Sequence, residues 1–213
     1  MSYSKKSITL KVVLLIFVVL LIDQISKIYV KTHFALGHGV DILGWFKIYF
    51  VENNGMAFGI EFFGKLFLTL FRVVAVCILV LFIYRLIKNG ARQGFVLTVS
   101  LVLAGAVGNI LDSVFYGILF SESTPYNIAQ FLPEGGGYAP LFYGKVVDML
   151  YFPLFTFPDW MPLLGGDVFF SPVFNIADSA MTTAIFLIII FFIKDLNKGL
   201  DRKNAEPDSP PNV

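Results

Sequence analysis

Acidic and amide side chains recur at helical spacing within the most apolar stretches of the sequence. The pairs are Asp23 with Lys27, Asn109 with Asp112, and Asn175 with Asp178. Residues three or four apart share one face of a helix. An ionisable side chain within a membrane span is costly enough to mark a functional site by default. These pairs are therefore the first candidates for chemistry.

The carboxylates of these pairs are predicted to lie at one depth in the membrane. Asp23 lies roughly 20 Å, and Asp112 roughly 26 Å, from the cytoplasmic ends of their helices at a rise of 1.5 Å per residue. Asp178 enters from the other side and lies only about 8 Å below the outer end of its span. Lys27 is the single lysine in this layer, so a purely structural set of ion pairs leaves acids unmatched.

Two carboxylates held close together suggest acid–base chemistry. They cannot both ionise easily, so one keeps its proton and acts as the acid while the other takes a proton from water. This is the chemistry of aspartic proteases. A further acid, Asp148, follows an apolar approach in segment 144–150 that would bring it beside the fourth span. We therefore predict Asp148 and Asp178 as a catalytic dyad.

The elements that must position these residues are four apolar spans. Residues 10–30, 66–87, 95–120 and 173–193 are each long enough to cross a hydrocarbon core, which takes about 20 helical residues. With 57% hydrophobic and 15% charged residues, the composition predicts an all-α membrane protein. The sequence lacks the runs of basic residues interleaved with aromatics that are typical of nucleic-acid binding.

Lysine and arginine collect at one set of span ends, so the positive-inside rule predicts that both termini are cytoplasmic. Segments 32–65 and 121–172 then face outward. Strand-like stretches at 45–50 and 168–170 and frequent prolines predict a small extracytoplasmic β-containing region with a loop insertion. Residues 1–203 are expected to form one membrane domain, and the proline-containing tail 204–213 is expected to be disordered and cytoplasmic.

Five sequence blocks, in order along nearly the whole chain, resemble the lipoprotein signal peptidase family, also called signal peptidase II. They are DQISK at 23–27, NNGMAFG at 53–59, GAVGNILD at 105–112, VVD at 146–148 and FNIAD at 174–178. Any one block is weak, but five in order are specific. The resemblance implies an endopeptidase of the bacterial inner membrane that acts near its extracytoplasmic face.

The family resemblance also implies a substrate and residue roles. The substrate would be a diacylglyceryl-modified prolipoprotein, cut just before its lipidated cysteine, and the only other partners implied are membrane lipids. No metal or organic cofactor is implied, and a monomer is expected. Asp148 and Asp178 match the catalytic aspartates. The remaining motif positions divide into substrate-binding or site-orienting residues (Asn53, Gly55, Asn109 and Asn175) and structural polar support (Asp23, Lys27 and Asp112).

Two features depart from the family pattern. Ser113 stands where the family usually has an arginine, and we hypothesise that a cation of the outward insertion, such as Lys145, replaces it. The stretches between Asp112 and Asp148 and between Asp148 and Asp178 are also longer than the compact pattern. The extra residues could form a lid over the site or serve as surface filler.

Two other functions fit some of these residues. A serine–lysine peptidase would use Ser26 as nucleophile and Lys27 as base, but adjacent helical residues do not face each other. A proton-coupled carrier would use the intramembrane acids as a relay, but we find no internal repeat of the kind such carriers show. A purely structural membrane subunit leaves the surplus acids unexplained.

Overall fold

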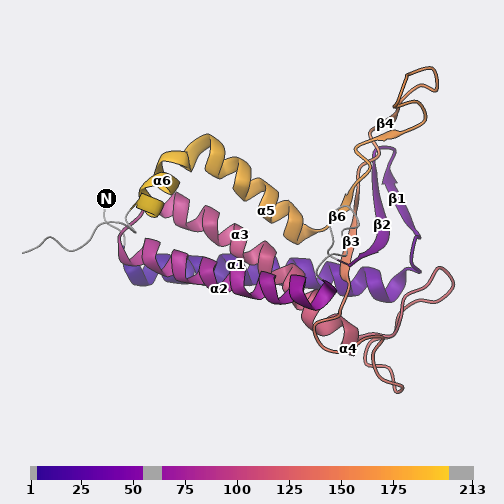
Figure 1. Cartoon of the computed structure of the whole chain (residues 1–213), viewed down its shortest axis with the longest axis horizontal. Coiled ribbons are helices and arrows are strands. Elements are labelled where there is room, and N and C mark those ends of the chain that lie inside the picture. Colours follow the sequence, from indigo (N-terminus) through magenta and orange to yellow (C-terminus); the bar gives the residue numbers. More distant parts are fainter. Residues whose placement is uncertain (1–3, 55–63, 202–213) are drawn as a thin grey trace, which may run out of the picture.

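The computed structural model describes residues 4–54 and 64–201, which form four long helices and a small sheet (Figure 1). The first two helices are α1 (Lys5–His33) and α2 (Gly64–Lys88). The third runs through α3 (Gln93–Leu111), the π-helical turn η2 (Asp112–Tyr116) and α4 (Gly117–Leu119). The fourth runs through α5 (Ile176–Leu187), the π-helical turn η3 (Ile188–Phe192) and α6 (Ile193–Asp201). All four are long and apolar enough to cross a membrane, and the chain is a multi-pass membrane protein.

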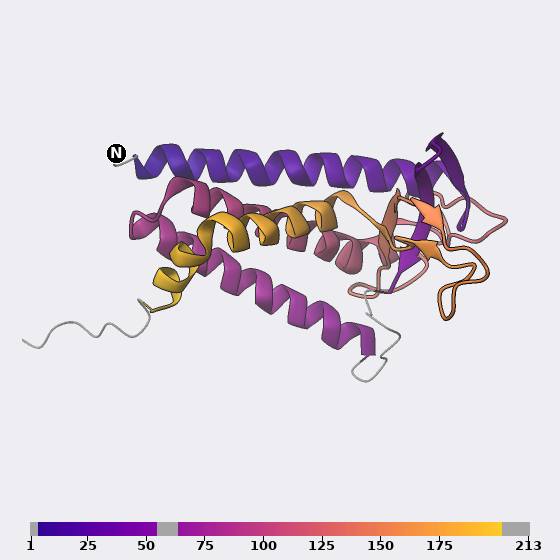
Figure 2. The ribbon, with the colours of Figure 1, turned by 90° about the horizontal axis from the view of Figure 1, so that it is seen from above.

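The strands stand across one end of the helical bundle, which we call the sheet end (Figures 1 and 2). The four-stranded antiparallel sheet has the order β1-β2-β3-β6, and β4 pairs with β5 in a separate two-stranded ribbon. The strands are β1 (Gly39–Leu43), β2 (Phe46–Asn53), β3 (Val146–Tyr151), β4 (Phe155–Thr156), β5 (Val168–Phe169) and β6 (Val173–Phe174). The predicted fold class, four membrane helices with a small β-containing region, is confirmed.

Several predicted span boundaries shift in the structure, including the end of the fourth helix, which continues to Asp201 rather than ending at residue 193. The fourth helix begins at Ile176 rather than at residue 173, because Val173 and Phe174 pair with β3 as strand β6. Asp178 therefore lies in the first turn of its helix rather than about one and a half turns inside it. The first helix continues to His33 instead of ending at residue 30. Gly55 and the tail 204–213 lie outside the described residues.

The helix α3 lies against α1, α2 and α5 and forms the centre of the bundle. Away from the sheet, its residues Phe95 and Val99 pack in an apolar core with Ile8 of α1 and Phe192 of η3. The outer faces of the other helices stay apolar where they are exposed, as at Leu10 and Phe17. Helices that are apolar all round suit a lipid environment.

Two glycines of α3 allow its neighbours to approach closely. A Cβ atom on Gly105 would lie 2.3 Å from the backbone oxygen of Ala177 in α5. A Cβ atom on Gly108 would lie 2.7 Å from Oδ2 of Asp23 in α1. Neither distance is compatible with a larger side chain unless the neighbours move. These glycines therefore bring α1 and α5 to the face of α3 that carries the polar residues.

Candidate active site

Asn175 begins α5 and fixes Asp178 in its first turn. The Asn175 side chain accepts a hydrogen bond from the backbone N–H of Asp178 at 2.9 Å, and the Asn175 backbone N–H donates to Oδ2 of Asp178 at 3.3 Å. This reciprocal capping box satisfies backbone donors that a helix start otherwise leaves free. The helix N-terminus also favours a negative charge at this position. Asp178 is partly exposed, so its carboxylate is held in place but remains accessible.

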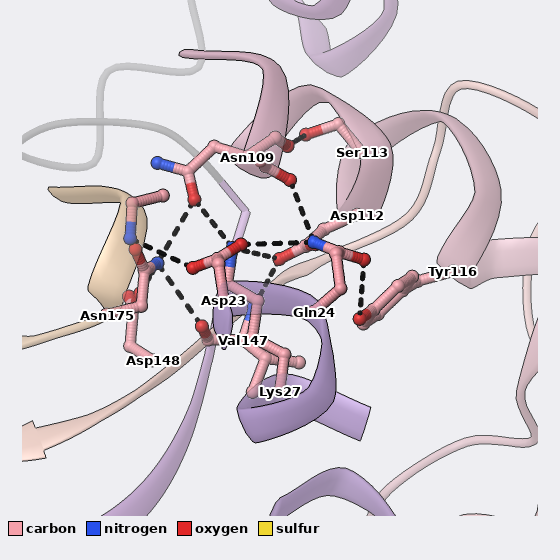
Figure 3. Close-up of polar contacts among 12 residues, drawn as sticks. Asp23, Gln24, Lys27, Asn109, Asp112, Ser113, Tyr116, Val147, Asp148 and Asn175 are labelled. Atoms are coloured by element: carbon pink, nitrogen blue, oxygen red, sulfur yellow. Dashed lines mark hydrogen bonds and ion pairs between the residues drawn. The ribbon is translucent and has the colours of Figure 1, made fainter. Parts of the chain in front are cut away.

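Asp148, a residue of the sheet, lies beside Asn175. It lies on β3, opposite Val51 of β2, and is only 4% exposed. β3 also pairs with β6, the strand that leads directly into Asn175. The Asn175 side-chain amide donates to Oδ1 of Asp148 at 2.7 Å and to the backbone oxygen of Val147 at 3.2 Å. One asparagine therefore contacts both predicted catalytic carboxylates. Figure 3 shows its contacts with Asp148 and Val147.

Asn109 of α3 also binds Asp178. Its Nδ2 donates to Oδ1 of Asp178 at 2.8 Å, while its Oδ1 accepts from Lys27 Nζ at 2.9 Å and from Asn175 Nδ2 at 3.1 Å. Because an ammonium group can only donate, Lys27 requires the amide oxygen of Asn109 to face it. The amide nitrogen must then point at Asp178. Lys27 thus orients the Asn109 amide as a donor towards Asp178. Within the described part of the chain, Lys27 itself binds Asn109, Asp23 and Asp112.

Lys27 is the centre of a buried ionic cluster that supports this arrangement. Its Nζ lies 2.9 Å from Oδ2 of Asp23 and 2.9 Å from Oδ2 of Asp112, and all three side chains are 0% exposed. With Asn109, these acceptors occupy the three donors of the ammonium group. Asp23 continues the chain of contacts by accepting from the backbone N–H of Ala177 at 2.9 Å. The cluster therefore ties α1, α3 and the start of α5 together.

The two predicted catalytic carboxyls differ in their surroundings. Burial, followed by the nearby charge of Asp178, raises the pKa of Asp148 to about 7. Hydrogen bonds from Asn175 and Asn53 act in the opposite direction but do not cancel this rise in the pKa. Near neutral pH the Asp148 carboxyl can therefore keep a proton. The arrangement offers a protonated acid next to a second carboxyl group.

The structure gathers nearly all the residues that the sequence singled out. Six elements place Asp148, Asp178, Asn53, Asn109, Asn175, Asp23, Lys27 and Asp112 in one connected set of hydrogen bonds and charge contacts. Ser26 does not act with Lys27 as a serine–lysine pair, because its hydroxyl donates to the Asp23 backbone oxygen at 2.8 Å. Lys145, the cation suggested to replace the usual arginine, pairs with Glu52 at 3.2 Å, and its role towards the substrate stays a prediction.

Several supporting residues were missed by sequence reasoning. Gln24 donates to Oδ1 of Asp112 at 2.9 Å and accepts from the Tyr116 hydroxyl at 3.1 Å. Its place beside Asp23 in the first block was an available signal. Lys31, one turn after Lys27, is also fully buried and pairs with Glu52, the residue before Asn53. Its position at a span end gave no indication of burial.

Residues 15–194 match the family model described as signal peptidase (SPase) II. The chain belongs to the signal peptidase II family. The lipoprotein signal peptidase of Porphyromonas gingivalis is 46% identical over 199 residues, covering 91% of this chain and 88% of that protein. The lipoprotein signal peptidase of Amoebophilus asiaticus is 38% identical over 181 residues, covering 79% and 72%.

Less similar proteins also match over most of this chain. A Staphylococcus aureus lipoprotein signal peptidase is 29% identical over 203 residues, covering 94% of this chain and 98% of that protein. A solved bacterial membrane enzyme, determined by the in meso method, is 27% identical with a TM-score of 0.59, covering 87% of this chain and 94% of that one. A second such structure, at 24% identity and a TM-score of 0.57, shares the fold.

Proposed function

We propose that this signal peptidase II family member is an aspartic endopeptidase whose catalytic residues are Asp148 and Asp178. The observation that carries the proposal is the bridging of the two carboxyl groups by Asn175, with Oδ1 of Asp148 at 2.7 Å from its side chain and Oδ2 of Asp178 at 3.3 Å from its backbone nitrogen. Burial and the Asp178 charge raise the pKa of Asp148 to about 7, as a shared proton requires.

In the proposed reaction Asp178 is the base and Asp148 is the acid. The Asp178 carboxylate takes a proton from water while the water oxygen bonds to the scissile carbonyl carbon. Asp148 gives its proton to the carbonyl oxygen, forming a neutral tetrahedral diol. When the C–N bond breaks, the proton held by Asp178 passes to the leaving nitrogen and a diol hydroxyl returns a proton to Asp148. Both aspartates then regain their starting states.

The proposed substrate is a diacylglyceryl-modified prolipoprotein, cut just before its lipidated cysteine. The names of the relatives and the family model support this choice, and an acyl-anchored substrate would approach a site at the sheet end of a membrane bundle.

We further propose an inner-membrane location with both termini cytoplasmic. Basic residues at the end opposite the sheet, Arg85, Lys88 and Arg92, support that orientation. Asn53, Asn109 and Asn175 would orient the dyad or the substrate backbone, and a monomer is expected.

The proposed substrate and cleavage site can be tested on purified full-length protein in detergent. A lipidated prolipoprotein would be incubated with it, and the product would be analysed by mass spectrometry. We expect a product whose first residue is the lipid-modified cysteine. The matched control is the same prolipoprotein with that cysteine replaced by serine, which cannot be lipidated. Equal cleavage of the control, or a cut elsewhere, would contradict the proposed specificity.

A further inference from the structure

The β4–β5 ribbon belongs to the stretch of the chain that is longer than the compact family pattern, and the proposed dyad does not use it. With the loop between its strands, the ribbon covers residues 154–170. Its exposed large apolar side chains are Leu154, Phe155, Trp160, Leu163, Leu164, Phe169 and Phe170. Trp160 is 79% exposed and Leu163 is 100% exposed. Apolar side chains gathered on a surface in this way mark a contact with a protein or a membrane.

The loop between the two strands binds its own backbone. The backbone N–H of Phe157 donates to the Asp167 oxygen at 2.9 Å, and the Gly166 N–H donates to the Phe157 oxygen at 3.1 Å. The Asp167 N–H donates to the Leu164 oxygen at 2.9 Å. A segment can enter an apolar environment only if its backbone groups are bonded internally. The loop can therefore leave water without losing the partners of these backbone groups.

The ribbon lies where the helices reach the membrane surface. Helix α1 has 29 residues and is roughly 43 Å long at a rise of 1.5 Å per residue, which is close to the thickness of a bilayer with its headgroups. Its terminus at the sheet end therefore lies in the headgroup layer. Figure 1 shows the sheet across this end of the bundle, with the ribbon extending past the edge of the bundle on the side of α5. The ribbon thus extends over the surrounding lipid.

The composition of the ribbon indicates which kind of partner it fits. Asp159 and Asp167 are its only charged residues, so it has no cation to attract an anionic partner. Tryptophan favours the membrane interface, because its ring is apolar and its N–H can bond to headgroups or water. The neighbouring helix α5 exposes Ile185 and Phe186, so the ribbon continues a surface that already faces lipid. These features favour a lipid interface over a charged protein surface.

We propose that the β4–β5 ribbon is a membrane-surface anchor that inserts Trp160 and Leu163 into the lipid interface beside α5. The inference rests on the membrane-spanning helices and not on the proposed dyad. The ligand is the headgroup and upper acyl region of the leaflet at the sheet end, and binding comes from apolar insertion. Because the ribbon carries no cation, this contact does not depend on anionic lipid and does not weaken when salt is added.

The test uses the emission of Trp160 in full-length protein reconstituted into phosphatidylcholine vesicles. The chain has two tryptophans, so Trp45→Phe leaves Trp160 as the single reporter. We expect a larger loss of emission when the acyl chains are brominated near the headgroup than when they are brominated near their methyl ends. Acrylamide in the water should cause little loss, and added salt should not change the result.

Two further variants, made in the Trp45→Phe background, show whether Leu163 contributes to insertion. Leu163→Asp should reduce quenching by lipid and increase quenching by acrylamide, because a charged side chain resists leaving water. The matched control is Tyr126→Asp, a 93% exposed residue of the segment between α4 and β3, which should change neither. Equal effects of the two variants, or no effect of Leu163→Asp, would contradict the role of Leu163.

The quenching pattern also separates the anchor from other arrangements of the ribbon. Strong quenching by acrylamide with none by brominated lipid would place Trp160 in water and overturn the proposal. Protection from both quenchers would mean that the ribbon folds over the site or packs against a second copy of the chain, which would equally overturn it. Unfolding temperatures matched to the wild type would show that the variants are folded.

Discussion

Two buried lysines, one helical turn apart on α1, have opposite charge surroundings. The Lys27 cluster (Asp23, Lys27 and Asp112) places two carboxylates around one lysine, whereas the Lys31 cluster (Lys31, Glu52, Ser123 and Lys145) places two lysines around one carboxylate. The first joins helices to one another. The second joins α1 to β2 and to the segment that leads into β3.

The difference indicates that the two lysines are not interchangeable supports. Lys27 is the charge partner of both Asp23 and Asp112, so removing it strands two buried acids. Removing Lys31 leaves Glu52 with Lys145 at 3.2 Å and with the Ser123 hydroxyl at 2.8 Å. A buried charge without its partner is far more costly than one that keeps a partner. The Lys27 cluster should therefore contribute more to the free energy of unfolding than the Lys31 cluster does.

The largest effect is expected from Lys27→Met, which keeps the side-chain volume and removes the charge. We expect a loss of about 3–5 kcal/mol in the free energy of unfolding, because two buried carboxylates lose their counter-charge. Thermal unfolding in detergent measures this. A loss no larger than that of Lys31→Met, made as the matched variant, would show that Lys27 contributes no more to stability than Lys31.

Gly108→Ala tests how tightly the Lys27 cluster is packed. The added Cβ would lie 2.7 Å from Asp23 Oδ2 and 3.1 Å from the Ala177 Cβ, so we expect a destabilisation of about 1–3 kcal/mol. The control is Gly135→Ala, since no atom lies within 4 Å of a Cβ built on Gly135. Equal unfolding temperatures for the two variants would show that α1 and α3 can separate at no cost.

Lys31→Met should have a smaller effect, about 1–2 kcal/mol, since it removes hydrogen bonds to a charged group but leaves Glu52 paired. Glu52→Gln sharpens the result, because it leaves Lys31 and Lys145 close together without their shared carboxylate. We expect Glu52→Gln to be the more destabilising of the two in the same unfolding measurement. The reverse order would mean that Lys145 does not compensate for Lys31.

The dyad and the Lys31 cluster should also respond differently to pH. The pKa of Asp148 is raised to about 7, so this carboxyl loses its proton, and cleavage should fall, as pH rises from 6 to 8. Its contribution to stability likewise declines as pH rises from about 4 to about 7, because the folded state then binds more protons than the unfolded state.

The pKa of Glu52 shifts in the opposite direction to that of Asp148. Burial alone would raise its pKa, but the charge and hydrogen bond of Lys31 outweigh burial and hold this pKa below its usual value. Its contribution is therefore complete above the unfolded value and is lost only as pH falls through the folded one. Of these two groups, only Asp148 should therefore change cleavage between pH 6 and 8. A flat profile over that range would contradict the role of Asp148 as the acid.

The same comparison explains what the sequence could reveal. Asp23, Lys27 and Asp112 were recognisable because all three lie on helices, where spacing alone predicts a shared face. The partners of Lys31 come from a strand and from the segment after α4, and their positions depend on tertiary contacts that no period encodes. The start of the fourth helix was misplaced for a related reason, since an apolar strand such as Val173–Phe174 cannot be told from a helical turn by hydrophobicity.

We propose that Asp148 and Asp178 perform the chemistry while the buried clusters only hold them in place. The most direct test compares cleavage of a lipidated prolipoprotein by the wild type, Asp148→Asn and Asp178→Asn at matched abundance and unfolding temperature. Asp167→Asn, an exposed aspartate of the β4–β5 ribbon, is the matched control. We predict that each dyad variant loses about 10²–10⁴-fold in rate and that the control cleaves normally. Wild-type cleavage by either dyad variant would contradict the claim.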